Sequence, residues 1–193
     1  MAATPSQMLA LGTPLPRFSL PDTVSGRSFD SETLKDAPAS IVAFICNHCP
    51  FVVHIRDRLA EFGRFCQERG VRMVAVSSND VDTHAQDAPT RMAEEAARVG
   101  YPFPYLYDES QEVAKAFRAA CTPEFYLFDG SARLVYRGQF DDSRPGNGAP
   151  VTGADLRAAV EAVLSGRSPS LEQRPSVGCN IKWKPGNAPD YFG

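Results

Sequence analysis

The 193-residue sequence predicts a single α/β domain built on a mixed sheet with helices on both faces. Two apolar runs of strand length, 40–45 and 71–76, flank an amphipathic stretch, which is the pattern of parallel strands joined by a right-handed crossover. A later pair of strands is joined by Asp129-Gly130, a sequence typical of hairpin turns, and adds antiparallel strands at one edge. With 43% hydrophobic residues, the chain can bury a substantial core.

We divide the chain into an N-terminal arm, residues 1–16, a central domain, residues 17–165, and a C-terminal extension, residues 166–193. The arm contains three prolines and no hydrophobic periodicity. The extension contains Gly, Pro and polar residues, and no pattern in it defines a helix or strand.

The first half of the central domain begins with a short hairpin, 18–20 and 28–29. The continuous apolar run 40–45 is typical of a parallel strand buried on both faces. After it, apolar side chains recur every three or four residues, which indicates one face of an amphipathic helix ended by Gly70. The residues of this face are Val52, Ile55, Leu59, Phe62 and Cys66.

The second half continues with a strand over 71–76 and a helical insert over 81–100, interrupted at Pro89 and ended by Gly100. The remaining predicted elements are a strand over 105–107, a helix over 110–119, hairpin strands over 124–128 and 134–139, and a last helix over about 155–164.

Charge and hydropathy exclude several classes of protein. The net charge is −3 with scattered basic residues, so we expect no nucleic-acid partner. No apolar run approaches the ~18–20 residues of a membrane helix, and residues 1–16 lack the features of a secretory signal. We therefore expect a cytoplasmic protein in which the five cysteines are reactive, metal-binding or buried, rather than a disulfide framework.

The motif Cys46-Asn47-His48-Cys49 lies where the buried strand leads into the helix. Unpaired N–H groups and the helix dipole stabilise an anion there, so a thiolate at this place has a lowered pKa. Two thiols three residues apart can also close into a disulfide, and a protonated His48 between them would further favour the thiolate.

Pro50 bears on which cysteine lies nearer the helix dipole. Proline is favoured at the first helical position, which makes Cys49 the N-cap, although Asn47 also suits that role. This places Cys49 nearer the dipole than Cys46. Two other interpretations of the pair are half of a zinc site, for which the chain has no second Cys-x-x-Cys, and inert buried thiols.

With these motifs the sequence resembles thioredoxin-fold proteins of the peroxiredoxin-like, or redoxin, group. The resemblance rests on the strand into Cys46-Asn-His-Cys49, on Thr122-Pro123, and on the stretches 138–147 and 175–187, which are similar to those of an uncharacterised branch. It implies a thioredoxin-like three-layer fold and a cis Pro123 beside the cysteines that shapes the substrate surface. It also implies that His48 and Thr122 line this surface, with the Thr122 backbone offered to a bound peptide or thiol.

The chain departs from the patterns of that group at several positions, among them Ile45 where thioredoxin usually has Trp, and no arginine can be assigned to bind a peroxide. Peroxiredoxins carry a Thr three residues before the peroxidatic cysteine, where this chain has Cys46. Thioredoxin usually carries a buried acid in the strand before its motif, and 41–45 has none.

Three cysteines lie outside the motif. Cys66 falls on the apolar helix face and is predicted to be buried core. Cys121 lies two residues before Pro123, and Cys179 lies in the C-terminal extension. Each is a candidate additional redox thiol. The alternative for Cys121 is a small buried side chain, and the alternative for Cys179 is a tail that only covers the sheet.

Together these observations predict a thiol–disulfide oxidoreductase in which Cys46 and Cys49 form the redox pair. The alternatives are a thiol peroxidase with Cys49 as the peroxidatic thiol, resolved by Cys46 or Cys179, and a non-catalytic module that docks partners beside Pro123. The expected substrate is a protein or small-molecule disulfide or a hydroperoxide, with a dithiol as reductant. No cofactor and no metal are expected, and the oligomeric state is left open.

Overall fold

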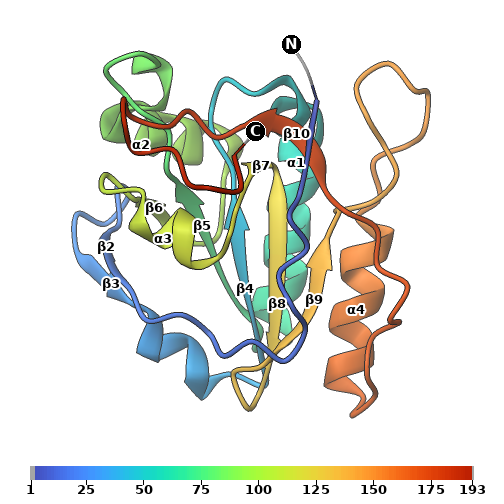
Figure 1. Ribbon diagram of the computed structural model, residues 1–193. Coiled ribbons are helices and arrows are strands. Elements are labelled where there is room, and N and C mark those ends of the chain that lie inside the picture. The colour runs from blue at the N-terminus through green and yellow to red at the C-terminus, as the bar shows by residue number, and fades with distance from the viewer. Residues whose placement is uncertain (1–2, 193) are drawn as a thin grey trace.

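The computed structural model describes residues 3–192 and is built around a five-stranded sheet (Figure 1). The strand order is β6-β5-β4-β8-β9. β4 is parallel to β5 and β5 to β6, whereas β8 is antiparallel to both β4 and β9, so the mixed sheet is confirmed. In chain order these strands are β4 (Ala39–Phe44), β5 (Arg72–Ser77), β6 (Tyr105–Tyr107), β8 (Glu124–Asp129) and β9 (Leu134–Gly138).

The sheet separates two hydrophobic cores, which gives the predicted three layers. Alternate residues of β4 face opposite sides, so Ile41 and Ala43 join one core and Val42 and Phe44 the other. The first core is covered by α1 (Pro50–Glu68), α2 (Pro89–Val99) and α4 (Ala154–Leu164). The second is covered by the hairpin β2 (Ser19–Pro21) and β3 (Ser28–Asp30), the 3-10 helix η1 (Ser31–Asp36) and α3 (Glu112–Ala116).

Two helices differ from the sequence-based expectation. The insert consists of a 3-10 turn, η2 (Ala85–Asp87), followed by α2, which starts at Pro89 because proline is tolerated in the first helical turn. α3 is shorter than the predicted 110–119, since Arg118 has a left-handed φ of 50° that ends the helix. Across residues 3–192, no helix combines the length and the apolar character required to cross a bilayer.

The arm and the C-terminal extension meet in a second sheet that the sequence does not predict. β1 (Thr4–Pro5), β10 (Val177–Asn180) and β7 (Cys121–Thr122) pair antiparallel in the order β1-β10-β7. Strands of two to four residues with partners far along the chain leave no local signal. Figure 1 shows β10 crossing the end of the molecule at which α1 begins.

Candidate functional site

The two cysteines of the motif lie at the junction of β4 and α1. Cys49 is the N-cap of α1 and Pro50 occupies the first helical turn, so of the two capping alternatives the structure has Cys49. Both side chains are buried, with 1% of Cys46 and none of Cys49 exposed.

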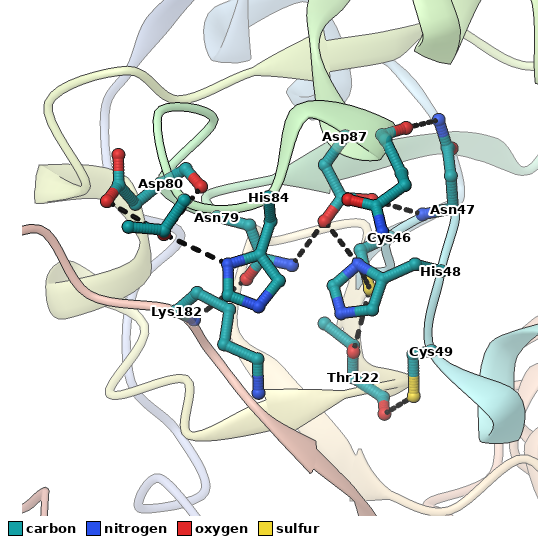
Figure 2. A network of polar contacts seen from close by, with 12 residues as sticks. Cys46, Asn47, His48, Cys49, Asn79, Asp80, His84, Asp87, Thr122 and Lys182 are labelled. Carbon is teal, nitrogen blue, oxygen red and sulfur yellow. Dashed lines mark hydrogen bonds and ion pairs between the residues drawn. The ribbon is translucent and has the colours of Figure 1, made fainter.

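The Thr122–Pro123 peptide lies opposite this pair and is cis. The Thr122 hydroxyl lies 3.4 Å from the Cys46 sulfur, and its carbonyl oxygen lies 3.1 Å from the Cys49 sulfur (Figure 2). The fold therefore brings the Cys-x-x-Cys and the Thr-Pro sequence together, although 73 residues separate Cys49 from Thr122.

The surroundings of the Cys49 sulfur favour a thiolate. A hydrogen bond from the Cys46 thiol is the largest effect, and further donors are the Cys179 thiol and the backbone N–H groups of Val52 and Cys179. Together they overcome burial and lower the pKa of Cys49 to about 5. The Thr122 carbonyl oxygen is an acceptor and opposes this effect, but the donors outnumber it.

Cys46 has the opposite character. Its thiol donates to Cys49, it is buried, and Asp87 lies nearby, and these three effects raise the pKa of Cys46 well above 9.0. At neutral pH the pair therefore consists of a Cys49 thiolate and a Cys46 thiol.

A buried carboxylate from the helical insert anchors the Cys46 side of the site. Asp87, in η2, accepts hydrogen bonds from the Asn47 backbone N–H at 2.8 Å and from the Asn79 side-chain amide at 2.8 Å (Figure 2). Its second oxygen also lies 2.6 Å from Nδ1 of His48. The insert thus places a buried acid beside the cysteine motif, and no motif in the sequence indicates it.

The Asp87 contacts determine how the His48 ring is used. Burial raises the pKa of Asp87, but hydrogen bonds from His48 and Asn79 outweigh burial and hold it below 3.8. An ionised carboxylate can only accept hydrogen bonds. Nδ1 of His48 therefore carries a proton and donates a hydrogen bond to Asp87. The Cys46 sulfur is 3.9 Å from the same nitrogen. His48 therefore orients toward Asp87, and its nearest sulfur is Cys46 rather than the thiolate of Cys49.

Cys46, His48 and Asp87 are also the residues that could hold a metal ion, because their ligand atoms lie within 4.8 Å of one another. Both oxygens of Asp87 are already hydrogen-bonded, to Asn47, His48 and Asn79. Hydrogen bonding accounts for the cluster without an ion.

A second buried acid lies next to Pro123. Glu124, 1% exposed, accepts from the backbone N–H groups of Ala120 and Cys121 and from the Tyr126 hydroxyl at 2.6 Å. Burial raises the pKa of Glu124 to about 7 despite these hydrogen bonds. The carboxyl group holds the short β7 segment that precedes the cis peptide.

Replacing Glu124 by Gln should make stability less sensitive to pH. The folded-state pKa lies above the ordinary 4.5, so the wild-type contribution is complete below about pH 4.5 and is lost as the pH rises through about 7. Gln keeps an acceptor for Ala120 and Cys121 and offers a donor to Tyr126. We expect the variant to be more stable than wild type at alkaline pH by about 3–4 kcal/mol, since the pKa rises from 4.5 to about 7 and each pKa unit corresponds to about 1.4 kcal/mol.

Urea denaturation at acidic and alkaline pH measures this difference. Glu109→Gln, at an exposed position, is the matched control and should show no such change. A Glu124→Gln variant that is destabilised at alkaline pH would contradict the prediction.

The remaining cysteines have three different environments. Cys179, in β10, lies opposite Thr122, whose carbonyl oxygen is 3.1 Å from the Cys49 sulfur. The Cys121 thiol instead faces Glu124, at 3.8 Å. Cys66 is fully buried on α1, as predicted, and burial raises its pKa to about 12.

The space beside Pro123 is small. A cavity of about 10 Å³ lies there, lined by Phe51, Ile55, Phe140 and Arg144 among others. That is room for about one water molecule. Access to the sulfur atoms is narrow in this conformation because Cys46 and Cys49 are themselves buried.

Comparison with known proteins agrees with this fold. The family model described as Redoxin matches residues 10–156, most of the chain. The chain belongs to the redoxin family. Its match spans both the Cys46–Cys49 motif and the Thr122–Pro123 peptide. None of the curated proteins is similar enough to this redoxin to count as a match.

Two solved structures are similar to this redoxin over nearly its whole length. An uncharacterized conserved protein from Geobacillus kaustophilus has 50% identity and a TM-score of 0.94, covering 96% of this chain and 98% of its own. A hypothetical protein from Sinorhizobium meliloti 1021 has 53% identity and a TM-score of 0.93, covering 95% and 100%.

A more distant structure confirms the thioredoxin-like fold. A thiol:disulfide interchange protein of the thioredoxin family from Chlorobium tepidum TLS has 22% identity and a TM-score of 0.61, covering 80% of this chain and 98% of its own. Family and fold together support a thiol-based redox function in general.

Proposed function

We propose that this redoxin is a thiol–disulfide oxidoreductase in which Cys49 is the attacking thiolate and Cys46 the resolving thiol. The observation that carries the proposal is the position of Cys49 at the N-cap of α1 with a second buried thiol, Cys46, in the same short loop, where the pKa of Cys49 is lowered to about 5 and that of Cys46 is raised. One sulfur is thus charged at neutral pH, and the other is a protonated thiol within its reach.

The reaction proceeds in two exchange steps. The Cys49 thiolate attacks one sulfur of a substrate disulfide, forms a mixed disulfide and releases the other sulfur as a thiolate. Cys46 then attacks the Cys49 sulfur, its proton passes to the second leaving thiolate, and a Cys46–Cys49 disulfide remains. Two electrons have moved to the substrate, and an external dithiol returns them to the protein.

Reaction of the reduced protein with hydroxyethyl disulfide, a small uncharged substrate, tests the proposal. After acid quenching, alkylation and peptide mapping, wild type should contain a Cys46–Cys49 bridge. Cys49→Ser should react at least about 100-fold more slowly, because the other thiols remain protonated at neutral pH. Cys66→Ser, at a buried position on the same helix, should react like wild type. A Cys49→Ser variant as fast as wild type would refute the assignment.

The burial of the sulfurs favours a second candidate function. Cys46, Cys49 and Cys179 are each 3% exposed or less, so a small substrate reaches them more readily than a folded protein does. A hydroperoxide is such a substrate: Cys49 would take its terminal oxygen as a sulfenic acid, and a neighbouring thiol would resolve it with loss of water. Peroxide consumption that exceeds disulfide reduction and requires only Cys49 would select this function.

A further inference from the structure

The strand that pairs with Thr122 necessarily lies beside Cys49. The Thr122 carbonyl oxygen is 3.1 Å from the Cys49 sulfur, and the residue opposite Thr122 in the antiparallel pair β7–β10 is Cys179. A cysteine of the C-terminal extension therefore lies opposite the residue that contacts the Cys49 sulfur.

The approach of β10 to β7 is unusually close at the residue before Cys179. A Cβ atom on Gly178 would lie 1.9 Å from the Thr122 carbonyl oxygen and 2.6 Å from its carbonyl carbon. Any residue other than glycine would push β10 away from Thr122. Gly178 thus permits the close spacing at which Cys179 lies opposite Thr122, the residue whose carbonyl oxygen contacts the Cys49 sulfur.

The strand is held from both sides. β1 pairs with β10 through Thr4 and Gly178, and the Ile181 N–H donates to the Ala120 carbonyl at 3.1 Å. Beyond the strand, the Lys182 N–H donates to the Asn79 side chain at 2.9 Å, and the same Asn79 contacts Asp87. Cys179 is only 3% exposed and lies in a hydrogen-bonded strand, so its position beside the site is well defined.

We propose that Cys179 is a third redox thiol of this site, which resolves a mixed disulfide on Cys49 in place of Cys46. The proposal rests on the proposed function, since it needs Cys49 to attack a disulfide first. Cys179 then attacks the Cys49 sulfur, a Cys49–Cys179 bond forms, and the bound substrate half leaves as a thiolate that takes up the Cys179 proton. One substrate disulfide is reduced to two thiols for each protein disulfide formed.

This chemistry gives the oxidised protein two alternative bridges that share Cys49. One closes the four-residue loop from Cys46, and the other ties the N-terminus of α1 to β10 in the C-terminal extension. The Cys46 thiol can attack the Cys49–Cys179 bridge and release Cys179, so the two bridges interconvert by exchange without a net change in oxidation state.

The Cys46→Ser variant tests the proposal, because it removes the competing thiol and keeps a hydroxyl donor beside Cys49. Reduced variant is treated with hydroxyethyl disulfide, quenched in acid and mapped by mass spectrometry. We expect a Cys49–Cys179 bridge and no retained mercaptoethanol. Adding Cys179→Ser to this variant should leave mercaptoethanol bound to Cys49. Adding Cys121→Ser, at an equally buried position whose thiol faces Glu124, should leave the bridge intact.

A mixed disulfide that persists on Cys49 of Cys46→Ser would overturn the role of Cys179 and leave the proposed function standing. Absence of a Cys46–Cys49 bridge in wild type would instead refute the proposed function. Circular dichroism establishes whether Cys46→Ser is folded. If the variant is not folded, wild type is equilibrated in glutathione redox buffers instead. Peptide mapping should then find a Cys49–Cys179 disulfide as well as the Cys46–Cys49 disulfide. Absence of the Cys49–Cys179 disulfide would refute the proposal.

Discussion

Titration of the reduced protein should reveal one thiolate with a midpoint near pH 5, seen as ultraviolet thiolate absorbance, and this thiolate should be Cys49. The Cys46 thiol makes the largest contribution by donating to Cys49, followed by the Cys179 thiol and the N–H groups of Val52 and Cys179. The other four cysteines have pKa values above 9.0, Cys46 chiefly because its thiol donates to Cys49 and the other three chiefly through burial, so their absorbance should appear only in alkali.

Substitutions at position 46 separate the causes of this midpoint. Cys46→Ala removes the donor and should move the midpoint upward by more than about one pH unit. Cys46→Ser keeps a hydroxyl donor and should move it less. Cys49→Ser should abolish the transition, and Cys66→Ser should leave it in place. A midpoint in the ordinary cysteine range, near 8.5, would contradict the electrostatic basis of the site.

Replacing Asp87 by Ala is expected to lower the free energy of unfolding by about 3–5 kcal/mol, because the buried donors lose their shared acceptor. The donors left unpaired are the Asn47 N–H, the His48 ring and the Asn79 amide. Urea denaturation at neutral pH measures the loss. Asp82→Ala, at an exposed position in the same insert, is the control and should change stability little.

The difference between wild type and Asp87→Ala should shrink in acid. The folded-state pKa of Asp87 lies below 3.8, so its contribution is present above the ordinary pKa and is lost as the pH falls through the folded-state value. A destabilisation of less than about 1 kcal/mol at neutral pH would show that the network around Asp87 contributes little, and that His48 does not depend on it.

Some features of the site follow from local sequence patterns, and others do not. The stripe from Val52 to Cys66 and the apolar run 40–45 specify α1 and β4 because each buries its side chains with a regular period. The preference of proline for a first helical turn places Cys49 at the N-cap of α1. These features depend on neighbours within a few residues.

The buried acids follow a different rule. Asp87 and Glu124 have no periodicity or motif that marks them, and each acts through donors that the fold brings from elsewhere. Asp87 is 40 residues from the Asn47 N–H that it accepts, in an insert the sequence predicts only as helical. A side chain of this kind is recognisable only once its partners are placed.

The mixed α/β sheet, the family resemblance and the cysteine pair at the start of a helix can all be predicted from the sequence, since all three arise from local periodicity and short motifs. The positions of Thr122 and Cys179 beside Cys49, the orientation of His48 toward Asp87 and the course of β10 over the site emerge only when the chain is folded. These contacts join residues at least 39 positions apart in the chain, so they depend on how the whole chain folds and no local pattern encodes them.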